Sequence, residues 1–151
     1  ELSWQATDNW NLSFSGGYLD AYYEDYTRAD GITVTEQQQA QAPEFTANLL
    51  SQLDFNESIR WNVEVDFADR YRFSDGHDVT APSRTLVHTQ LSWRIENWET
   101  QLWINNAFDE TYYTRGFGGF SNDPRDFYEF DEPYYQLGNG RQTGVTVRYQ
   151  F

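Results

Sequence analysis

Side chains that could bind a ligand gather in one segment near the C-terminal end of this 151-residue chain. Phenylalanine and tyrosine rings can stack on a ligand, and arginine and carboxylate groups can orient it. The other interpretation is that the rings pack the segment onto its own protein, while the acidic groups face solvent or bind divalent ions. The candidate ligand-binding residues are Arg115, Phe117, Phe120, Arg125, Tyr128, Tyr134 and Tyr135.

Two arginines of this segment, Arg115 and Arg125, would suit an anionic ligand. The acidic residues around them, Asp123 and Asp126 among them, would repel such a ligand unless both guanidinium groups point toward it. The tyrosines could equally stack on sugar rings. The segment therefore predicts ligand binding and leaves the ligand open between an anion and a carbohydrate.

Residues that could catalyse a reaction or hold a metal are sparse. The chain has no cysteine and two histidines, His77 and His88. His77 lies near Asp75 and Asp78, where a metal site and a solvated loop are both open interpretations. His88 falls on the polar side of a predicted strand, where a hydrogen-bonding role suffices. An outer-membrane enzyme would need a Ser/His pair or paired carboxylates, and no Ser/His pair is evident in this sequence. We therefore predict no catalytic residue. We also predict no metal site and no cofactor.

The composition excludes several classes of protein. The net charge is −14, with 24 acidic and 10 basic residues, which is the wrong sign for binding nucleic acid. No apolar run of 18 residues occurs, so the sequence predicts no transmembrane helix. Aromatic residues make up 19% of an otherwise polar chain. Such a content is typical of membrane β-barrels, which carry aromatic girdles at both membrane interfaces.

Strict alternation of apolar and polar residues runs through most of the chain. The clearest case begins at Ile59, after which every second residue to Phe67 is apolar and those between them are polar or charged. A period of two predicts a β-strand with one apolar and one polar face. Seven such strands are predicted, covering residues 2–6, 10–22, 45–55, 59–73, 87–95, 98–108 and 142–151.

The connections between these strands alternate between short and long. Three tight turns join successive pairs, and three long polar loops cover residues 24–43, 74–83 and 114–140. Short turns on one side and long loops on the other are typical of an outer-membrane barrel. A soluble sandwich would scatter its long connections over both ends. The fold predicted is therefore all-β, a transmembrane antiparallel β-barrel or a part of one.

Aromatic residues at both ends of the strands support this prediction. The ten residues from Trp61 to Tyr71 span about 33 Å along a strand, or roughly 24 Å when tilted. The apolar band of such barrels is about 25 Å tall. The residues beside the short turns are Trp4, Trp10, Phe55, Trp61, Trp93, Trp98 and Tyr149, and those at the far ends are Tyr18, Tyr22, Tyr71, Phe73, Tyr112 and Tyr113.

The last strand resembles the C-terminal targeting signal of bacterial outer-membrane barrels. The apolar residues that carry the resemblance are Val145, Val147, Tyr149 and Phe151. The resemblance implies a Gram-negative outer membrane, with the short turns and the C-terminus in the periplasm and the long loops outside. It also implies contacts with lipid and lipopolysaccharide, and insertion by the barrel assembly machinery.

Three further motifs resemble those of TonB-dependent outer-membrane receptors. Residues 105–113 are similar to an Asn-Leu-Phe-Asp-x-x-Tyr motif carried here by Asn106, Phe108, Asp109 and Tyr112, with Ala107 in place of leucine. Residues 42–49 resemble the family's Ala-Pro-x-x-Thr-x-Asn strand entry, and residues 140–144 its approach to the final strand. Turn chemistry gives these residues a structural role, because Asn106 and Asp109 can bond backbone groups where a strand ends. Tyr112 and Tyr113 could anchor that end at the lipid headgroups.

The resemblance implies a barrel of about 22 strands, plugged by an N-terminal globular domain. Residues 1–151 would then be the C-terminal portion of the barrel, as a fragment or as one polypeptide of a split barrel. The partners would be the remaining strands, the plug and TonB, which delivers the energy for import. A ferric siderophore is the leading substrate. Oligosaccharide, cobalamin and peptide uptake stay open, as do a structural or adhesive barrel and, more remotely, an outer-membrane enzyme.

Overall fold

The computed structural model describes residues 1–28, 31–75, 78–116 and 134–151. Every regular element in these ranges is a β-strand. No helix in the described part of the chain is long and apolar enough to cross a membrane.

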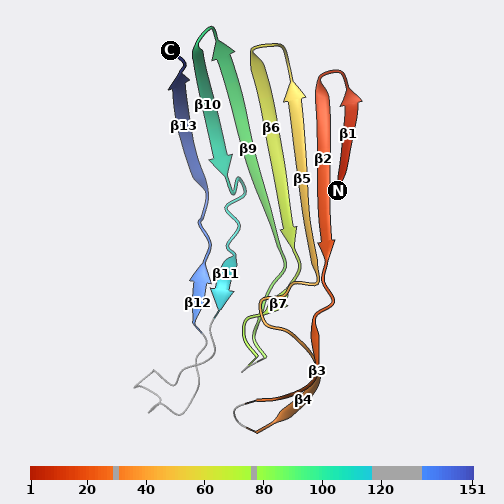
Figure 1. Cartoon of the computed structure of the whole chain (residues 1–151). Helices are drawn as coiled ribbons and strands as arrows, with labels where there is room; N and C mark the ends of the chain where they lie inside the picture. The colour runs from red at the N-terminus through yellow and green to blue at the C-terminus, as the bar shows by residue number, and fades with distance from the viewer. Residues whose placement is uncertain (29–30, 76–77, 117–133) are drawn as a thin grey trace, which may run out of the picture.

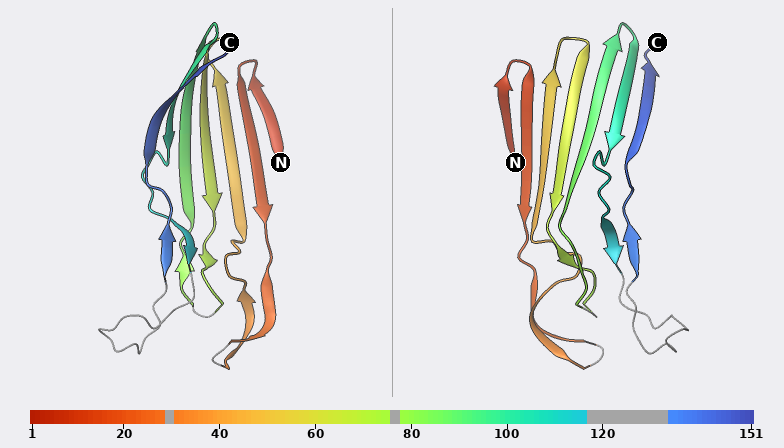
Figure 2. Two further views of the ribbon diagram at one scale, coloured as in Figure 1. Left: turned by 60° about the vertical axis from the view of Figure 1, so that its left-hand side comes forward. Right: turned by 180° about the vertical axis from the view of Figure 1, so that it is seen from behind.

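One antiparallel sheet of seven strands forms most of the structure (Figure 1). Each strand pairs with the next along the chain, in the order β1-β2-β5-β6-β9-β10-β13. The seven strands of the sequence analysis are therefore confirmed. Their bounds are β1 Leu2–Thr7, β2 Trp10–Tyr18, β5 Phe45–Asp54, β6 Ile59–Ala68, β9 Arg84–Ile95, β10 Trp98–Asn105 and β13 Gln142–Tyr149. Figure 2 shows the sheet as a twisted, open wall with the N-terminus and C-terminus at opposite edges.

The three long connections contain strands of their own. They form two-stranded hairpins, β3 (Tyr22–Thr27) with β4 (Thr33–Gln38), β7 (Tyr71–Arg72) with β8 (Thr80–Ala81), and β11 (Tyr113–Gly116) with β12 (Tyr135–Leu137). All three lie at one end of the sheet, which we call the hairpin end, and the short turns lie at the other, the turn end (Figure 1).

The expectation of structureless loops and uninterrupted strands was wrong at this end. The predicted strands 10–22 and 59–73 each break in two, and the sheet strands contain between 6 and 12 residues. The alternation of side chains continues past the break, but the backbone pairs within each hairpin and no longer with the sheet. Local pairing gives these backbone groups the partners that an open loop would leave to water.

Side chains on one face of the sheet are apolar and exposed. One row of laterally paired residues crosses six strands, and five of its six side chains are between 38% and 62% exposed. The row consists of Trp10, Leu53, Trp61, Leu91, Leu102 and Val145. A surface of this kind requires an apolar environment, since leaving it in water costs about 25 cal/mol per Å².

Indole and hydroxyl groups on this apolar face are hydrogen-bonded within the protein. The indole Nε1 of Trp10 donates to Ser51 Oγ at 2.9 Å, and that of Trp61 donates to Thr89 Oγ1 at 2.7 Å. The Thr89 hydroxyl in turn donates to the carbonyl of Asn62. Polar groups inside hydrocarbon must be satisfied by the protein itself, and these contacts meet that condition.

The opposite face is polar. Gln52, Asn62 and Gln90 pair laterally in one row, which continues to Trp103 and Gly144. Gly144 lies so close to the Trp103 ring that a Cβ built on the glycine would be 2.2 Å from the indole. Glycine is therefore required at position 144 because the ring fills the space of a side chain.

The buried hydrophobic cluster lies in the hairpins, and Leu86 of the sheet strand β9 is also buried, at 6% exposure. Tyr71, Phe73 and Ala81 are 8%, 2% and 1% exposed, and Tyr113 packs against them. The sequence predicted an aromatic girdle facing lipid that included these tyrosines and Phe73, and this prediction was wrong for Tyr71 and Phe73. The hairpins bring these rings together, so Tyr71 does not mark the edge of the apolar band.

The two faces predict a clear labelling pattern for cysteine variants of the full-length protein in a membrane. Cysteine at Val65 or Leu102 should react with a lipid-soluble probe, and cysteine at Asn62 or Gln90 with a water-soluble maleimide. The natural chain has no cysteine and serves as the background control. Reversed labelling at either pair would show that the faces are assigned the wrong way round.

The contact between Gly144 and Trp103 predicts a stability change. Gly144→Ala should destabilise the barrel by about 1–3 kcal/mol, because the added methyl group overlaps the indole. Adding Trp103→Ala should recover part of the loss. Gly17→Ala is the matched control, since its Cβ would meet only the rotatable Thr46 hydroxyl, at 3.1 Å. Thermal unfolding in detergent measures the effect, and equal stability of both single variants would contradict it.

Candidate functional site

An aromatic cluster joins two of the hairpins. The Phe73 ring lies 5.6 Å from Tyr113 and 4.9 Å from Tyr135, and these two tyrosines are 5.2 Å apart. Gly116 permits the approach, because a Cβ there would lie 2.3 Å from the Phe73 ring. The β7–β8 and β11–β12 hairpins therefore share one small core.

The described candidates for ligand binding are Arg115 in β11, Tyr135 in β12 and Tyr134, the residue before β12. Tyr135 belongs to the aromatic cluster, although 40% of it is exposed, so the packing interpretation describes this residue. Burial, followed by the neighbouring Tyr113, raises the pKa of Tyr135, which keeps the phenol neutral. Arg115, in β11, and Tyr134, directly before β12, are both exposed. Phe117, Phe120, Arg125 and Tyr128 lie outside the described residues, as do Asp123 and Asp126.

An ion-pair cluster joins the β3–β4 hairpin to the β7–β8 hairpin. Asp78 Oδ1 accepts from Nη2 of Arg28 at 2.9 Å and from Nη2 of Arg72 at 2.8 Å. Both arginine side chains are largely enclosed, at 13% and 15% exposure, whereas the Asp78 side chain is 79% exposed. The hydrogen bonds from Arg72 and then Arg28 hold the pKa of Asp78 below its usual range. The carboxylate is therefore charged at neutral pH.

A second carboxylate, Asp75, extends this junction through neutral donors. Its two oxygens lie 3.2 Å from the amide of Ala40 and 3.4 Å from the Tyr23 hydroxyl. The negative charge of Asp75 raises the pKa of Tyr23. Gln37 is buried at 7% exposure and accepts from Arg28 at 3.1 Å. The sequence analysis missed this junction, because its partners are up to 50 residues apart and no local pattern marks them.

Two family-motif residues after β10 form hydrogen bonds with the segment before β13. Asn106 is 3% exposed and adopts a positive φ of 50°. Its side chain donates to the carbonyls of Glu110 and Asn139 and accepts from the Glu110 amide. Asp109 accepts from the Arg141 amide at 2.7 Å. The predicted bonding of backbone groups by Asn106 and Asp109 is therefore confirmed.

Tyr112 and Phe108, the aromatic residues of the motif, lie in different environments. The Tyr112 ring covers Gly138, where a Cβ would be 2.0 Å from the ring, and the Arg84 guanidinium lies 4.9 Å from the Tyr112 ring centre. Phe108 is 77% exposed. The anchoring of Tyr112 at lipid headgroups stays a prediction.

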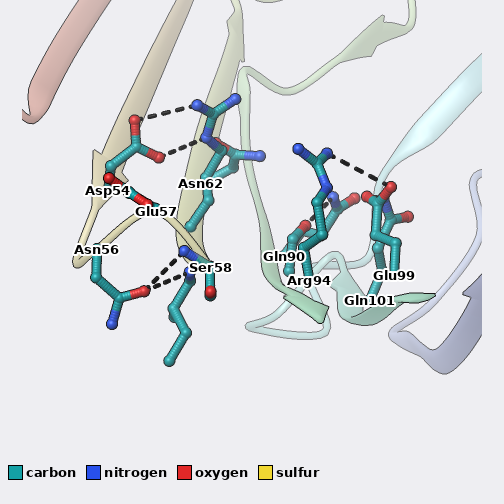
Figure 3. A pocket seen from close by; sticks show the side chains of 12 residues that line it. Asp54, Asn56, Glu57, Ser58, Asn62, Gln90, Arg94, Glu99 and Gln101 are labelled. Atoms are coloured by element: carbon teal, nitrogen blue, oxygen red, sulfur yellow. Dashed lines mark hydrogen bonds and ion pairs between the residues drawn. The ribbon is translucent and has the colours of Figure 1, made fainter. Parts of the chain in front are cut away.

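The polar face carries paired charges at the turn end (Figure 3). Arg60 donates to both oxygens of Asp54, at 2.6 and 3.1 Å, and Arg94 lies 3.7 Å from Glu99. Between these pairs is a recess of about 220 Å³ that glutamine, asparagine and serine side chains also line. Such a surface can hydrogen-bond a polar partner.

A second polar group lies further along the same face. The amide of Asn48 donates to Glu64 at 2.8 Å and to Asp66 at 2.7 Å, and His88 Nε2 is 3.6 Å from Asp66. Within the described ranges, no three His, Cys, Asp or Glu side chains are placed to hold a metal ion.

The residues of the targeting signal stand exposed along the β13 edge. Val145, Val147 and Tyr149 are 62%, 57% and 43% exposed, and Phe151 is fully exposed. The Tyr149 ring contacts Trp98 at 4.7 Å and Phe151 at 5.0 Å. This arrangement presents an apolar edge, and its role in targeting stays a prediction.

Comparisons with known proteins agree on one fold. The siderophore receptor PiuA from Acinetobacter baumannii is 19% identical, with a TM-score of 0.72 over 96% of this chain and 20% of that chain. The ferric yersiniabactin uptake receptor FyuA from Yersinia pestis is 15% identical, with a TM-score of 0.73 over 99% of this chain and 22% of that chain. The ferric-catecholate import receptor Fiu from E. coli K12 is 18% identical, with a TM-score of 0.72 over 99% of this chain and 20% of that chain. No curated protein matches the sequence.

The chain spans about a fifth of the length of these solved structures. The family model described as "TonB dependent receptor-like, beta-barrel" matches residues 1–107, more than half of the chain. This match confirms the family resemblance, and it includes the motif at residues 42–49. The chain belongs to the TonB-dependent receptor family, within the β-barrel of that family.

Proposed function

We propose that this chain forms part of the wall of an outer-membrane transporter that imports a scarce nutrient with energy from TonB. The observation that carries the proposal is a seven-stranded family sheet with an exposed apolar face and a polar, charge-paired face. The apolar face would contact lipid and lipopolysaccharide, and the polar face would line the lumen. The family consists of transport receptors, which favours import over catalysis.

Residues 1–151 would be the C-terminal portion of the barrel, whose remaining strands and plug come from the same precursor or a partner chain. The edge strands β1 and β13 each have one neighbour in this sheet, and barrel closure would supply the other. The hairpin end would be extracellular and the turn end periplasmic. The charged recess at the turn end would then face the plug. The barrel assembly machinery would recognise the edge strand β13.

The substrate would be a ferric siderophore, and Arg115 and Arg125 would attract its negative charge. Support comes from the three solved structures named above, whose titles describe siderophore, yersiniabactin and catecholate receptors. An oligosaccharide is the second candidate, favoured by exposed Tyr134 and by acidic residues that would repel an anion.

Replacing charges in the 115–126 segment tests the siderophore proposal. Arg115→Ala combined with Arg125→Ala should lower ferric siderophore uptake several-fold, because the ligand loses its attractive charges. Asp123→Ala combined with Asp126→Ala is the matched control and should leave uptake unchanged or raise it. Uptake is measured in iron-starved cells with a panel of siderophores and oligosaccharides.

The same assay distinguishes the glycan candidate. Tyr134→Ala removes an exposed ring, whereas Tyr135→Phe keeps the packing of the aromatic cluster and serves as its control. Normal siderophore uptake in the double arginine variant, together with lost sugar uptake in Tyr134→Ala, would replace the iron proposal with a glycan one.

A further inference from the structure

We propose that the polar face of the sheet carries a binding subsite for neutral carbohydrate, with the Trp103 indole as its stacking platform. The subsite lies on the wall formed by β6, β9 and β10, apart from the hairpins and from the 115–135 segment. It rests on the proposed function, because it needs the polar face to line the lumen, and it deepens the oligosaccharide candidate.

A row of carboxamide side chains crosses the polar face and ends at Trp103. Lateral pairing aligns one residue from each of the seven sheet strands, and neighbouring strands are about 4.8 Å apart. The first five members of the row are all asparagine or glutamine. The row consists of Gln5, Asn11, Gln52, Asn62, Gln90, Trp103 and Gly144. Carboxamides offer hydrogen-bond donors and acceptors without carrying a charge.

The Trp103 ring lies flat against the wall. Its six-membered ring covers Gly144, where a Cβ would be 2.2 Å from the indole, and its Nε1 donates to Thr146 Oγ1 at 3.3 Å. One face of the ring is therefore against the β13 backbone, and the side chain as a whole is only half-buried. The opposite face can stack on the apolar C–H surface of a sugar ring.

A recess of about 190 Å³ beside this ring supplies the polar groups. Asn62, Gln90 and Asn105 line it, and the first two come from neighbouring strands (Figure 3). Within the described ranges, the carboxamides of Asn62 and Asn105 have no hydrogen-bond partner, and that of Gln90 only donates, to Ser92 Oγ at 3.0 Å. A carboxamide can donate to one hydroxyl and accept from the next, which matches the adjacent hydroxyls of a sugar.

The ionisable groups beside the recess already have partners. Glu64 accepts from Asn48 at 2.8 Å. His88 Nδ1 accepts from the Asn106 amide at 3.4 Å, and His88 Nε2 lies 3.6 Å from Asp66. The two carboxylates would repel an anion at this wall. The unpaired carboxamides can bind neutral hydroxyl groups, so the charge pattern favours a neutral ligand over an anionic one.

An extended peptide is the other neutral ligand rich in hydrogen-bonding groups. A peptide binds a sheet most readily by adding a strand at a free edge. Strands β6, β9 and β10 each pair on both sides, so they offer no such edge. A flat indole with separate carboxamides around it suits a ring that carries hydroxyls better than an extended backbone.

Oligosaccharide binding to the full-length protein tests the proposal. Calorimetry uses maltotetraose, cellotetraose and xylotetraose in a detergent without a sugar headgroup, because an alkyl glycoside would compete for the subsite. Wild type should bind at least one of them. Trp103→Ala should weaken that binding about tenfold or more, because the platform is lost. Trp103→Phe should weaken it less, since a ring still covers Gly144. Asn62→Ala and Asn105→Ala should each weaken it about threefold to tenfold.

Matched variants separate the subsite from folding and from general loss of an indole or an amide. Trp93→Ala removes an indole that is 52% exposed on the apolar face. Asn11→Ala removes a carboxamide of the same row that already bonds Gln5 and Ser13. Neither should change tetraose binding. Thermal unfolding shows which variants keep wild-type stability, and the two recess asparagine variants decide the matter if Trp103→Ala does not fold.

Unchanged binding in a folded Trp103→Ala variant, or in both recess asparagine variants, would overturn the proposal. An equal loss in Trp93→Ala would do the same, as would a wild type that binds no tetraose or prefers a neutral Gly-Ser hexapeptide. If the variants follow the expected pattern but cells import no oligosaccharide, the subsite stands and sugar import falls. If cells import a tetraose that the Trp103 and asparagine variants bind normally, import stands and the subsite falls.

Discussion

Backbone pairing is the constraint on which this structure depends. A chain that crosses hydrocarbon must bond every N–H and C=O within the protein, since no water is available there. The five inner strands of the sheet pair on both sides, in register over long stretches such as the ten paired residues of β6 and β9, and β1 and β13 each pair on one side. Because the side-chain period is two, this register alone sends the apolar residues to one face and the polar residues to the other.

The sheet and the hairpins are stabilised in different ways. The sheet has almost no buried side chain among its described residues, so its apolar face needs lipid to make burial favourable. The hairpins carry their own core around Phe73 and their own charged junction at Asp78. The sheet and the hairpins can therefore change independently of each other.

Polar side chains act mainly where regular pairing stops. Asn106 takes over backbone bonding at the end of β10, and Asn56 accepts from the amides of Ser58 and Ile59 in a turn. Asp78 ties two hairpins whose backbones hardly pair with each other. The result is a set of connections that hold their shape without a continuous sheet.

The sequence by itself determined the strand count, the two faces, the alternation of short and long connections, and the role of Asn106 and Asp109. The two faces depend on side chains two residues apart, and Asn106 bonds Glu110 four residues away, so a local pattern records them. The particular partners Asn139 and Arg141, which bond Asn106 and Asp109, are distant in sequence and came from the tertiary structure. Only the tertiary structure decided that Tyr71 and Phe73 are buried, that Tyr135 packs against them, and that Asp78 joins Arg28 to Arg72. These contacts join residues distant in sequence, brought together by hairpin pairing beyond the end of the sheet, and no periodicity along the chain encodes which partners meet there.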